Sequence, residues 1–152
     1  MNRKAIKFYI SILTHFFEYF KSHIKKDNSR TFILDAGCGT GKIAKKLADF
    51  GFQVYGVDFS EEIISLAREN APKVNFQVAS VYKLPFSLGM FDIVICLGLF
   101  QTVSDRERAL QEIFRVLKPG GILAIRTLNS FSVGSLFLSK DTMRFSSPFE
   151  FS

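Results

Sequence analysis

The residues best placed to do chemistry lie in one short segment, Leu34-Asp35-Ala36-Gly37-Cys38-Gly39-Thr40-Gly41-Lys42. Three glycines at alternate positions let the backbone turn tightly and let a ligand approach main-chain atoms. A second acidic residue, Asp58, follows 19 residues after Gly39. A carboxylate at the end of a strand can accept hydrogen bonds from both hydroxyls of a ribose. The pattern therefore predicts a site for a small ligand that carries a ribose.

Two common phosphate-binding patterns do not fit this segment. The dinucleotide pattern G-x-G-x-x-G, started at Gly37, requires a third glycine where Lys42 stands. The P-loop pattern G-x-x-x-x-G-K-[ST] finds Ala36 in place of its first glycine and Ile43 in place of its hydroxyl residue. The glycines therefore indicate a ligand that is not held by its phosphates.

The surrounding sequence alternates between predicted strands and predicted helices. We expect strands over 31–36, 52–57, 74–79, 91–97 and 122–128, and helices over 40–50, 60–70 and 104–117. Ser60 is a predicted N-cap, Gly51 a helix stop, Ser104 to Glu107 a capping box, and 118–121 a type II turn. This alternation predicts an α/β domain with a parallel sheet and helices on both faces. Ligands bind such sheets at the carboxyl ends of the strands.

The Asp-x-Gly-x-Gly-x-Gly segment and Asp58 together resemble the first two motifs of class I S-adenosylmethionine-dependent methyltransferases, in the branch that acts on small molecules such as quinone precursors. Three later segments are similar to further motifs of that family, and the resemblance covers about residues 31–129. They are Val54 to Ser60, Leu84-Pro85-Phe86 with Phe91 to Val94, and Arg115 to Gly121. The resemblance implies a Rossmann-like fold with sheet order 3-2-1-4-5. It also implies S-adenosyl-L-methionine as cofactor and S-adenosyl-L-homocysteine as product.

The resemblance also implies roles for particular residues. The backbone of Ala36, Gly37, Cys38 and Gly39 would line the methionine part of the cofactor, and Asp35 would anchor the loop. Asp58 would hold the ribose hydroxyls, and Phe59 would pack near the adenine. Cys96 and Leu97, with Gly98, would end the fourth strand beside the methyl-transfer centre.

The sequence departs from the family pattern at two places in this site. Relatives place an acidic residue on the adenine amino group four positions before Leu84, where this chain has Ser80. We expect weaker adenine recognition there, or a contact from the backbone of Val81. Relatives of small-molecule type often carry a histidine where Gln101 and Thr102 stand, so the sequence identifies no catalytic residue.

The few cysteines and histidines do not predict a metal site. Two cysteines and two histidines form no recognisable metal cluster or disulfide framework. We expect Cys38 and Cys96 to be core residues. His15 and His23 are expected to be solvated or packing residues, with a lid contact to substrate as the alternative.

Charge and hydrophobic periodicity set the N-terminal segment apart. The chain has 152 residues, 47% of them apolar, and a net charge of +6, which is the size and balance of one globular domain. Residues 1–30 carry +5 of that charge, and an apolar stripe at helical spacing runs through residues 3–26. This segment predicts an amphipathic helix that packs on the domain or acts as a lid, with contact to a membrane surface as the alternative. It fits neither a signal peptide nor a membrane span. We therefore divide the chain into this helix (1–28), a cofactor-binding core (29–130) and a Phe-rich tail (131–152).

The C-terminal part is shorter than the family pattern. Relatives continue into a hairpin that forms strands six and seven, which we expect to be missing here. The fifth strand would then be an exposed edge, open to pairing with another chain. A truncated form, a self-pairing homodimer and half of a larger assembly are the three alternatives.

Three functions stay open at the sequence level. The first is a cytoplasmic methyltransferase for a small, apolar acceptor. The second is a non-catalytic protein or partner-dependent subunit that keeps the fold. The third is an RNA or protein methyltransferase that docks through its basic N-terminal helix. Motifs of nucleic-acid base methyltransferases are absent after the fourth strand, where the chain reads Ile95-Cys96-Leu97-Gly98.

Overall fold

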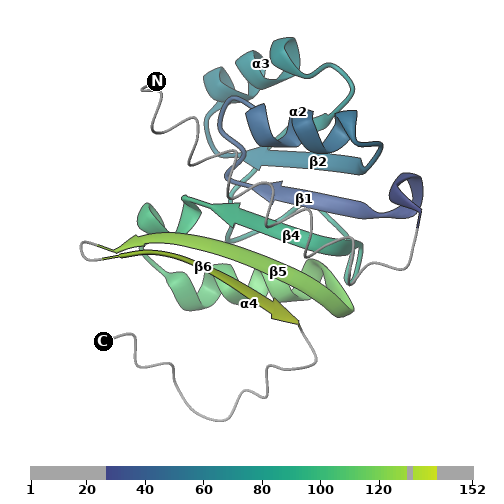
Figure 1. Ribbon diagram of the computed structural model, residues 1–152. Helices are drawn as coiled ribbons and strands as arrows, with labels where there is room; N and C mark the ends of the chain where they lie inside the picture. Colours follow the sequence, from purple (N-terminus) through teal and green to yellow (C-terminus); the bar gives the residue numbers. More distant parts are fainter. Residues whose placement is uncertain (1–26, 130–131, 140–152) are drawn as a thin grey trace.

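A central sheet organises the part of the chain described by the computed structural model, residues 27–129 and 132–139 (Figure 1). Its strand order is β3-β2-β1-β4-β5-β6. The strands are β1 (Phe32–Ala36), β2 (Gln53–Asp58), β3 (Asn75–Val78), β4 (Phe91–Leu97), β5 (Leu117–Asn129) and β6 (Ser132–Ser139). Strands β1 to β5 pair in parallel, which confirms the predicted order 3-2-1-4-5. The helix expected over residues 3–26 lies outside the described residues.

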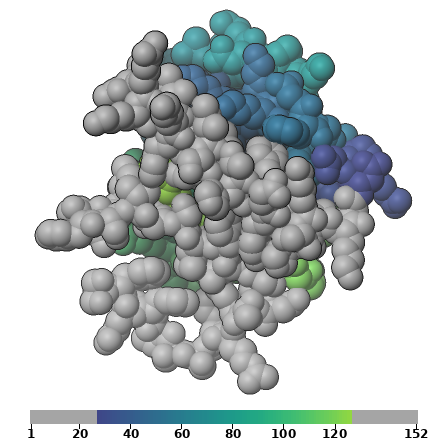
Figure 2. Space-filling model, viewed as in Figure 1, coloured from purple at the N-terminus to yellow at the C-terminus, as the bar shows by residue number. Residues whose placement is uncertain are grey.

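Helices cover both faces of this sheet. They are α2 (Lys42–Asp49), α3 (Glu61–Asn70) and α4 (Arg106–Val116), with short 3-10 turns η1 (Asn28–Arg30) and η2 (Leu99–Gln101). Buried residues of α2 and α3 pack with Ile33 and Ile95 on one face. Buried residues of α4 pack with Leu34 and Val94 on the other. In the space-filling view, the blue and teal atoms of α2 and α3 lie at the upper right of the visible surface (Figure 2). None of the helices within the described ranges is long and apolar enough to cross a membrane.

The centre of the sheet is buried on both faces, as its sequence predicts. Ile93, Val94, Ile95 and Cys96 of β4 each have 0% exposure. A continuous apolar run is what a parallel strand between two helical layers requires. This burial makes β1 and β4 rigid supports for the loops that follow them.

The predicted helix ends are largely confirmed, with two shifts. The Ser60 side chain accepts a hydrogen bond from the backbone N–H of Ile63 and caps α3. Gly51 follows α2 with a positive φ of 90° and so acts as its stop. The capping box expected at Ser104 is wrong, because Asp105 is the N-cap of α4. Helix α2 begins at Lys42 rather than residue 40, because the preceding loop still turns at position 41.

Strand β5 begins at Leu117, before residue 122, where we expected it to start. Leu117 already pairs with Phe91, and the register then shifts before Ile122 pairs with Ile93. The intervening residues 118–121 contain Gly120 with a φ of 71°, which a type II turn requires at its third position. The predicted turn therefore lies inside the strand as an irregularity.

The expectation that β5 leaves an exposed edge is wrong. Strand β6 pairs antiparallel with β5 from Asn129↔Ser132 to Ile122↔Ser139. It lies in the C-terminal tail, where we expected no strand. The backbone groups on this side of β5 are therefore used within the chain. The homodimer expected through an open β5 edge therefore lacks that edge in this structure.

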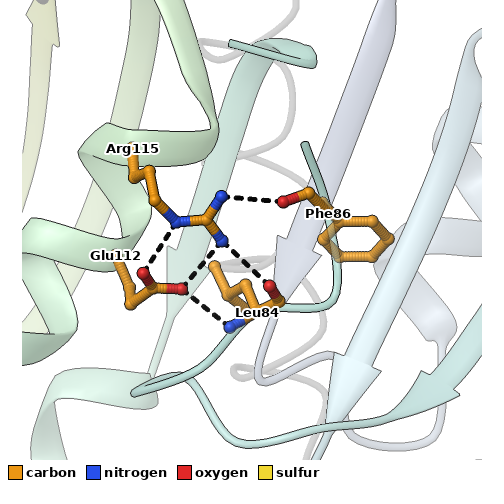
Figure 3. A network of polar contacts seen from close by, with 4 residues as sticks. All are labelled: Leu84, Phe86, Glu112 and Arg115. Atoms are coloured by element: carbon orange, nitrogen blue, oxygen red, sulfur yellow. Dashed lines mark hydrogen bonds and ion pairs between the residues drawn. The ribbon is translucent and has the colours of Figure 1, made fainter. Parts of the chain in front are cut away.

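A polar network fixes the long connection between β3 and β4 onto helix α4 (Figure 3). The Arg115 guanidinium donates to the carbonyls of Leu84 (2.9 Å) and Phe86 (2.8 Å) and to the Glu112 carboxylate (2.7 and 2.9 Å). The second oxygen of Glu112 also accepts from the backbone N–H of Leu84 at 2.8 Å. These bonds hold the pKa of Glu112 below its usual range. The network therefore adds polar links to the apolar packing that already joins the two chain segments.

Replacement of Arg115 by lysine tests this network. A single ammonium cannot serve two carbonyls and both carboxylate oxygens, so Arg115→Lys should lower the free energy of unfolding by about 1–2 kcal/mol. Urea unfolding monitored by circular dichroism measures the change. Arg106→Lys, on the exposed first turn of the same helix, is the matched control and should leave the midpoint unchanged. Equal midpoints for both variants would contradict the role of the network.

Candidate functional site

The glycine-rich loop after β1 folds back onto the end of β2. The backbone N–H groups of Gly37 and Cys38 both donate to the carbonyl of Val57, at 2.8 and 3.0 Å. The glycines at 37, 39 and 41 have φ values of 75°, 52° and 75°. Side chains other than glycine rarely adopt such values, so the loop depends on all three.

The ring of Phe76, on β3, packs against this loop. A Cβ atom built on Gly41 would lie 2.6 Å from the Phe76 ring, and one built on Gly56 would lie 2.5 Å from it. Both glycines therefore leave room for the ring, which packs between β2 and the loop. The side-chain amide of Asn70 adds a second support by donating to the carbonyl of Thr40 at 3.1 Å.

Asp58 stands at the end of β2, beside the loop. One of its carboxylate oxygens accepts from the N–H of Gly39 at 3.2 Å, and the other accepts from the N–H of Ser60 at 3.1 Å. The side chain is partly buried. Each carboxylate oxygen can accept more than one hydrogen bond. The carboxylate is thus fixed in orientation and retains capacity for the hydroxyls of a ligand.

Asp35 is buried at the end of β1, under the same loop. It is only 4% exposed. Burial raises its pKa to about 7, the N–H of Ala44 opposes that shift, and the Asp58 carboxylate adds to it. A carboxylate in this position is costly unless a cation lies nearby. Asp35 is therefore partly protonated near neutral pH, and a nearby cation would favour its charged form.

The turn after β3 lies next to Asp58. The N–H of Ala79 donates to the Asp58 carbonyl at 2.9 Å, and the following turn contains Ser80 and Val81. The Ser80 hydroxyl accepts from the N–H of Tyr82 at 3.2 Å, while the Val81 side chain is buried. Phe59, on the other side of Asp58, is 80% exposed. An exposed phenylalanine beside a fixed carboxylate offers a flat apolar surface to a ring.

The segment after β4 closes the site from the other side. Gly98 has a φ of 101°, and a Cβ built there or on Gly39 would meet nothing within 4 Å. A Cβ built on Gly37, by contrast, would lie 3.2 Å from the Leu99 side chain. Leu97 is partly buried and Cys96 is fully buried. The loop and the post-β4 segment therefore touch at one point and leave open space on either side of it.

The remaining candidates near this segment carry no obvious proton-transfer chemistry. Burial raises the pKa of the Cys38 and Cys96 thiols far above their ordinary value, so both are neutral core thiols, as expected. Gln101 and Thr102 are exposed, and the Thr102 hydroxyl donates to the Leu99 carbonyl at 2.9 Å. His15 and His23 lie outside the described residues.

The predicted site residues thus meet at one edge of the sheet, where β1, β2, β3 and β4 end. Gly39 and Gly98 border open space, Asp58 offers acceptors for hydroxyls, and Asp35 favours a cation. Within 27–129 and 132–139 no group of three or more side chains could hold a metal ion. The arrangement fits a cationic nucleoside better than a phosphate ester.

Comparison with known proteins agrees with this geometry. The family described as "Methyltransferase domain" matches residues 34–125, which is more than half of the chain. The chain belongs to this family. The matched range includes every residue of the glycine-rich loop, Asp58, the β3 turn and the end of β4. The methyltransferase domain is of the S-adenosylmethionine-dependent type.

Individual relatives carry the same description. The domain is 38% identical to the methyltransferase-named YqeM of Bacillus subtilis, over 69% of this chain and 45% of that protein. It is 36% identical to a ubiquinone biosynthesis O-methyltransferase of Coxiella burnetii, over 64% of this chain and 43% of that protein. A crystal structure of a SAM-dependent methyltransferase from Methanosarcina mazei is 34% identical, with a TM-score of 0.65, covering 71% of this chain and 56% of that one. The chain thus spans less than half the length of these two curated relatives.

Sequence reasoning missed the residues that support the site of this methyltransferase domain. Phe76 was not identified, although a glycine inside an apolar strand, Gly56, is a signal of close approach by another group. No sequence pattern indicated a role for Tyr82, because its hydrogen-bond partners are 22 and 23 residues away.

The buried carboxyl group of Asp35 generates a pH prediction for the ligand-free domain. The folded-state pKa of about 7 lies above the ordinary value of 3.8. The folded state therefore holds a proton that the unfolded state has lost, and Asp35 lowers stability as pH rises from about 4 to 7. Asp35→Asn should remove this component and be the more stable protein at pH 8, by up to about 4 kcal/mol. Urea unfolding of both proteins at pH 4, 6 and 8 measures it. A difference that does not grow with pH would contradict the assigned burial.

Proposed function

We propose that this domain binds S-adenosyl-L-methionine at the glycine-rich loop and Asp58 and transfers its methyl group to a small, apolar acceptor. The observation that carries the proposal is the Asp58 carboxylate, which two backbone N–H groups hold at the edge of open space beside Gly39. Membership of the methyltransferase family supports the reaction type.

The residues present fit this cofactor. The backbone of Ala36, Gly37, Cys38 and Gly39 would line its methionine part, and Gly37 and Gly39 hold the positive φ values that this turn requires. The buried carboxyl group of Asp35 would lie near its positive charges. Asp58 would accept hydrogen bonds from the two ribose hydroxyls.

The adenine would be held mainly by packing. Phe59 offers an exposed ring on one side. On the other side, Ser80 supplies a hydroxyl in place of the carboxylate found in relatives, and Val81 supplies its backbone. A hydroxyl forms a weaker hydrogen bond than a carboxylate does. We therefore expect contacts with the ribose and the methionine part to supply most of the binding free energy.

When bound, the cofactor supplies a methyl group on a cationic sulfonium, which is already activated as a leaving group. The chain then has to hold an acceptor in line with that methyl group, which is work of proximity and orientation. Cys96, Leu97 and Gly98 would border the transfer site. The described part of the chain holds no histidine at all, so the proposed role of these residues is positioning and exclusion of water.

The apolar acceptor is supported by two observations. Leu97 and Leu99 are the chain neighbours of Gly98, where a Cβ would meet open space, and both are apolar. One relative is named as a ubiquinone biosynthesis O-methyltransferase, a name that fits a small-molecule acceptor.

Calorimetric titration tests the cofactor site. We expect the wild-type chain to bind S-adenosyl-L-methionine and S-adenosyl-L-homocysteine, and Asp58→Asn to weaken both by at least about tenfold, because hydrogen bonds to a charged group are lost. Asp49→Asn, an exposed acid on α2, is the matched control and should bind like the wild type. A folded wild-type chain that binds neither compound would refute the proposal.

Transfer of a labelled methyl group tests the acceptor. With methyl-labelled cofactor, we expect label to enter a short-chain polyprenyl catechol and not bulk RNA or casein. Label in RNA or casein would instead support the alternative that the acceptor is a macromolecule. Cofactor binding without transfer to any of the three would support a non-catalytic domain.

A further inference from the structure

Two loops at the functional edge are joined through one phenol group. The Tyr82 hydroxyl oxygen accepts hydrogen bonds from the backbone N–H groups of Ser104 (3.0 Å) and Asp105 (3.2 Å). It also shares a hydrogen bond with the Ser104 hydroxyl at 3.2 Å. These bonds hold the pKa of Tyr82 below its ordinary value. The guanidinium of Arg108 lies over its ring, 5.6 Å from the centroid.

These two loops follow strands that are not neighbours. Tyr82 belongs to the turn after β3, and Ser104 belongs to the segment after β4. In the sheet, β2 and β1 separate these strands. The Tyr82 contact therefore spans the ends of both central strands, where the glycine-rich loop and Asp58 lie.

Each joined segment also touches the proposed cofactor site directly. The turn after β3 begins at Ala79, whose N–H donates to the carbonyl of Asp58. The segment after β4 contains Leu99, whose side chain lies against Gly37. Tyr82 consequently sets the spacing between two walls of the same site.

Capping of helix α4 does not account for the hydrogen bonds that the Tyr82 hydroxyl accepts. The first turn of α4 is already capped by Asp105, whose side chain accepts from the N–H of Arg108 at 3.0 Å. The Tyr82 oxygen accepts instead from two backbone groups that precede the helix. Its hydrogen bonds therefore fix the segment before α4 rather than the helix itself.

We infer that Tyr82 is a positioning residue for the adenosyl part of the cofactor, because its hydroxyl fixes the distance between the turn after β3 and the segment after β4. This inference rests on the proposed function. Without the hydroxyl, both segments would have to be ordered at the moment of binding, and the ligand would bear that cost.

The test compares Tyr82→Phe with the wild-type chain. Phenylalanine keeps the ring under Arg108 and removes only the shared oxygen. We expect its dissociation constant for S-adenosyl-L-homocysteine, measured by calorimetry, to rise about fivefold. For 5′-methylthioadenosine, which keeps the adenosyl part but lacks the amino acid, we expect the same factor.

Arg115→Lys is the matched control. It weakens the other attachment of the same connection to α4, at Leu84 and Phe86, and so destabilises the fold without touching the spacing at Tyr82. We expect it to bind S-adenosyl-L-homocysteine within twofold of the wild type. A loss that follows stability alone would appear in both variants.

The outcomes separate the two proposals. If the wild-type chain binds and Tyr82→Phe binds within twofold of it, or if both variants weaken binding equally, the role of Tyr82 is refuted and the proposed function stands. If the folded wild-type chain binds neither ligand, the proposed function fails and the role of Tyr82 fails with it. Hydrogen exchange provides a second measurement, because the amides of Ser104 and Asp105 should exchange faster in Tyr82→Phe.

Discussion

The structure depends on the closure of the glycine-rich loop onto the end of β2. Three consecutive backbone N–H groups, those of Gly37, Cys38 and Gly39, all donate to β2, two to the Val57 carbonyl and one to the Asp58 carboxylate. The loop position is therefore set by the parallel register of β1 and β2, which the buried core holds in place. The positive φ angles in the loop are the condition for this closure, and the Phe76 ring fills the space that it leaves.

The closure also concentrates negative charge. It brings the Asp58 carboxylate close enough to Asp35 to raise the pKa of the buried acid further. Groups that carry function are often poorly placed for stability, since a site built for a ligand is incomplete without it. A ligand with a positive charge near Asp35 would offset this cost. The buried Asp35, which costs the free domain stability, is thus the group whose charged form a cationic ligand would stabilise.

Local features of the fold were predictable from the sequence, and features that depend on distant contacts were not. The glycine spacing, Asp58 and the Ser60 cap are each defined within a few residues, so pattern and chemistry were sufficient to locate them. The cap of α4 was placed one residue early because Ser104 turns toward Tyr82, on another segment. Strand β6 was missed because the tail has no clear alternation, and its backbone pairing with β5 does not depend on a side-chain pattern. Phe76 resembles any other core residue until the sheet places it over Gly56.

The part of the chain that matches its relatives contains the proposed cofactor site but does not identify the methyl acceptor. The matched range ends at residue 125, within β5, and contains the whole proposed cofactor site. The curated relatives are more than twice as long as the part they share with this chain. The shared part is thus the part proposed to hold the methyl donor, and fold alone does not fix the acceptor. Within the shared part, the residues at 99–102 after β4 are apolar or carry an amide or a hydroxyl. None of these four side chains is a strong base, so the proposed transfer assigns no deprotonation of the acceptor to this segment.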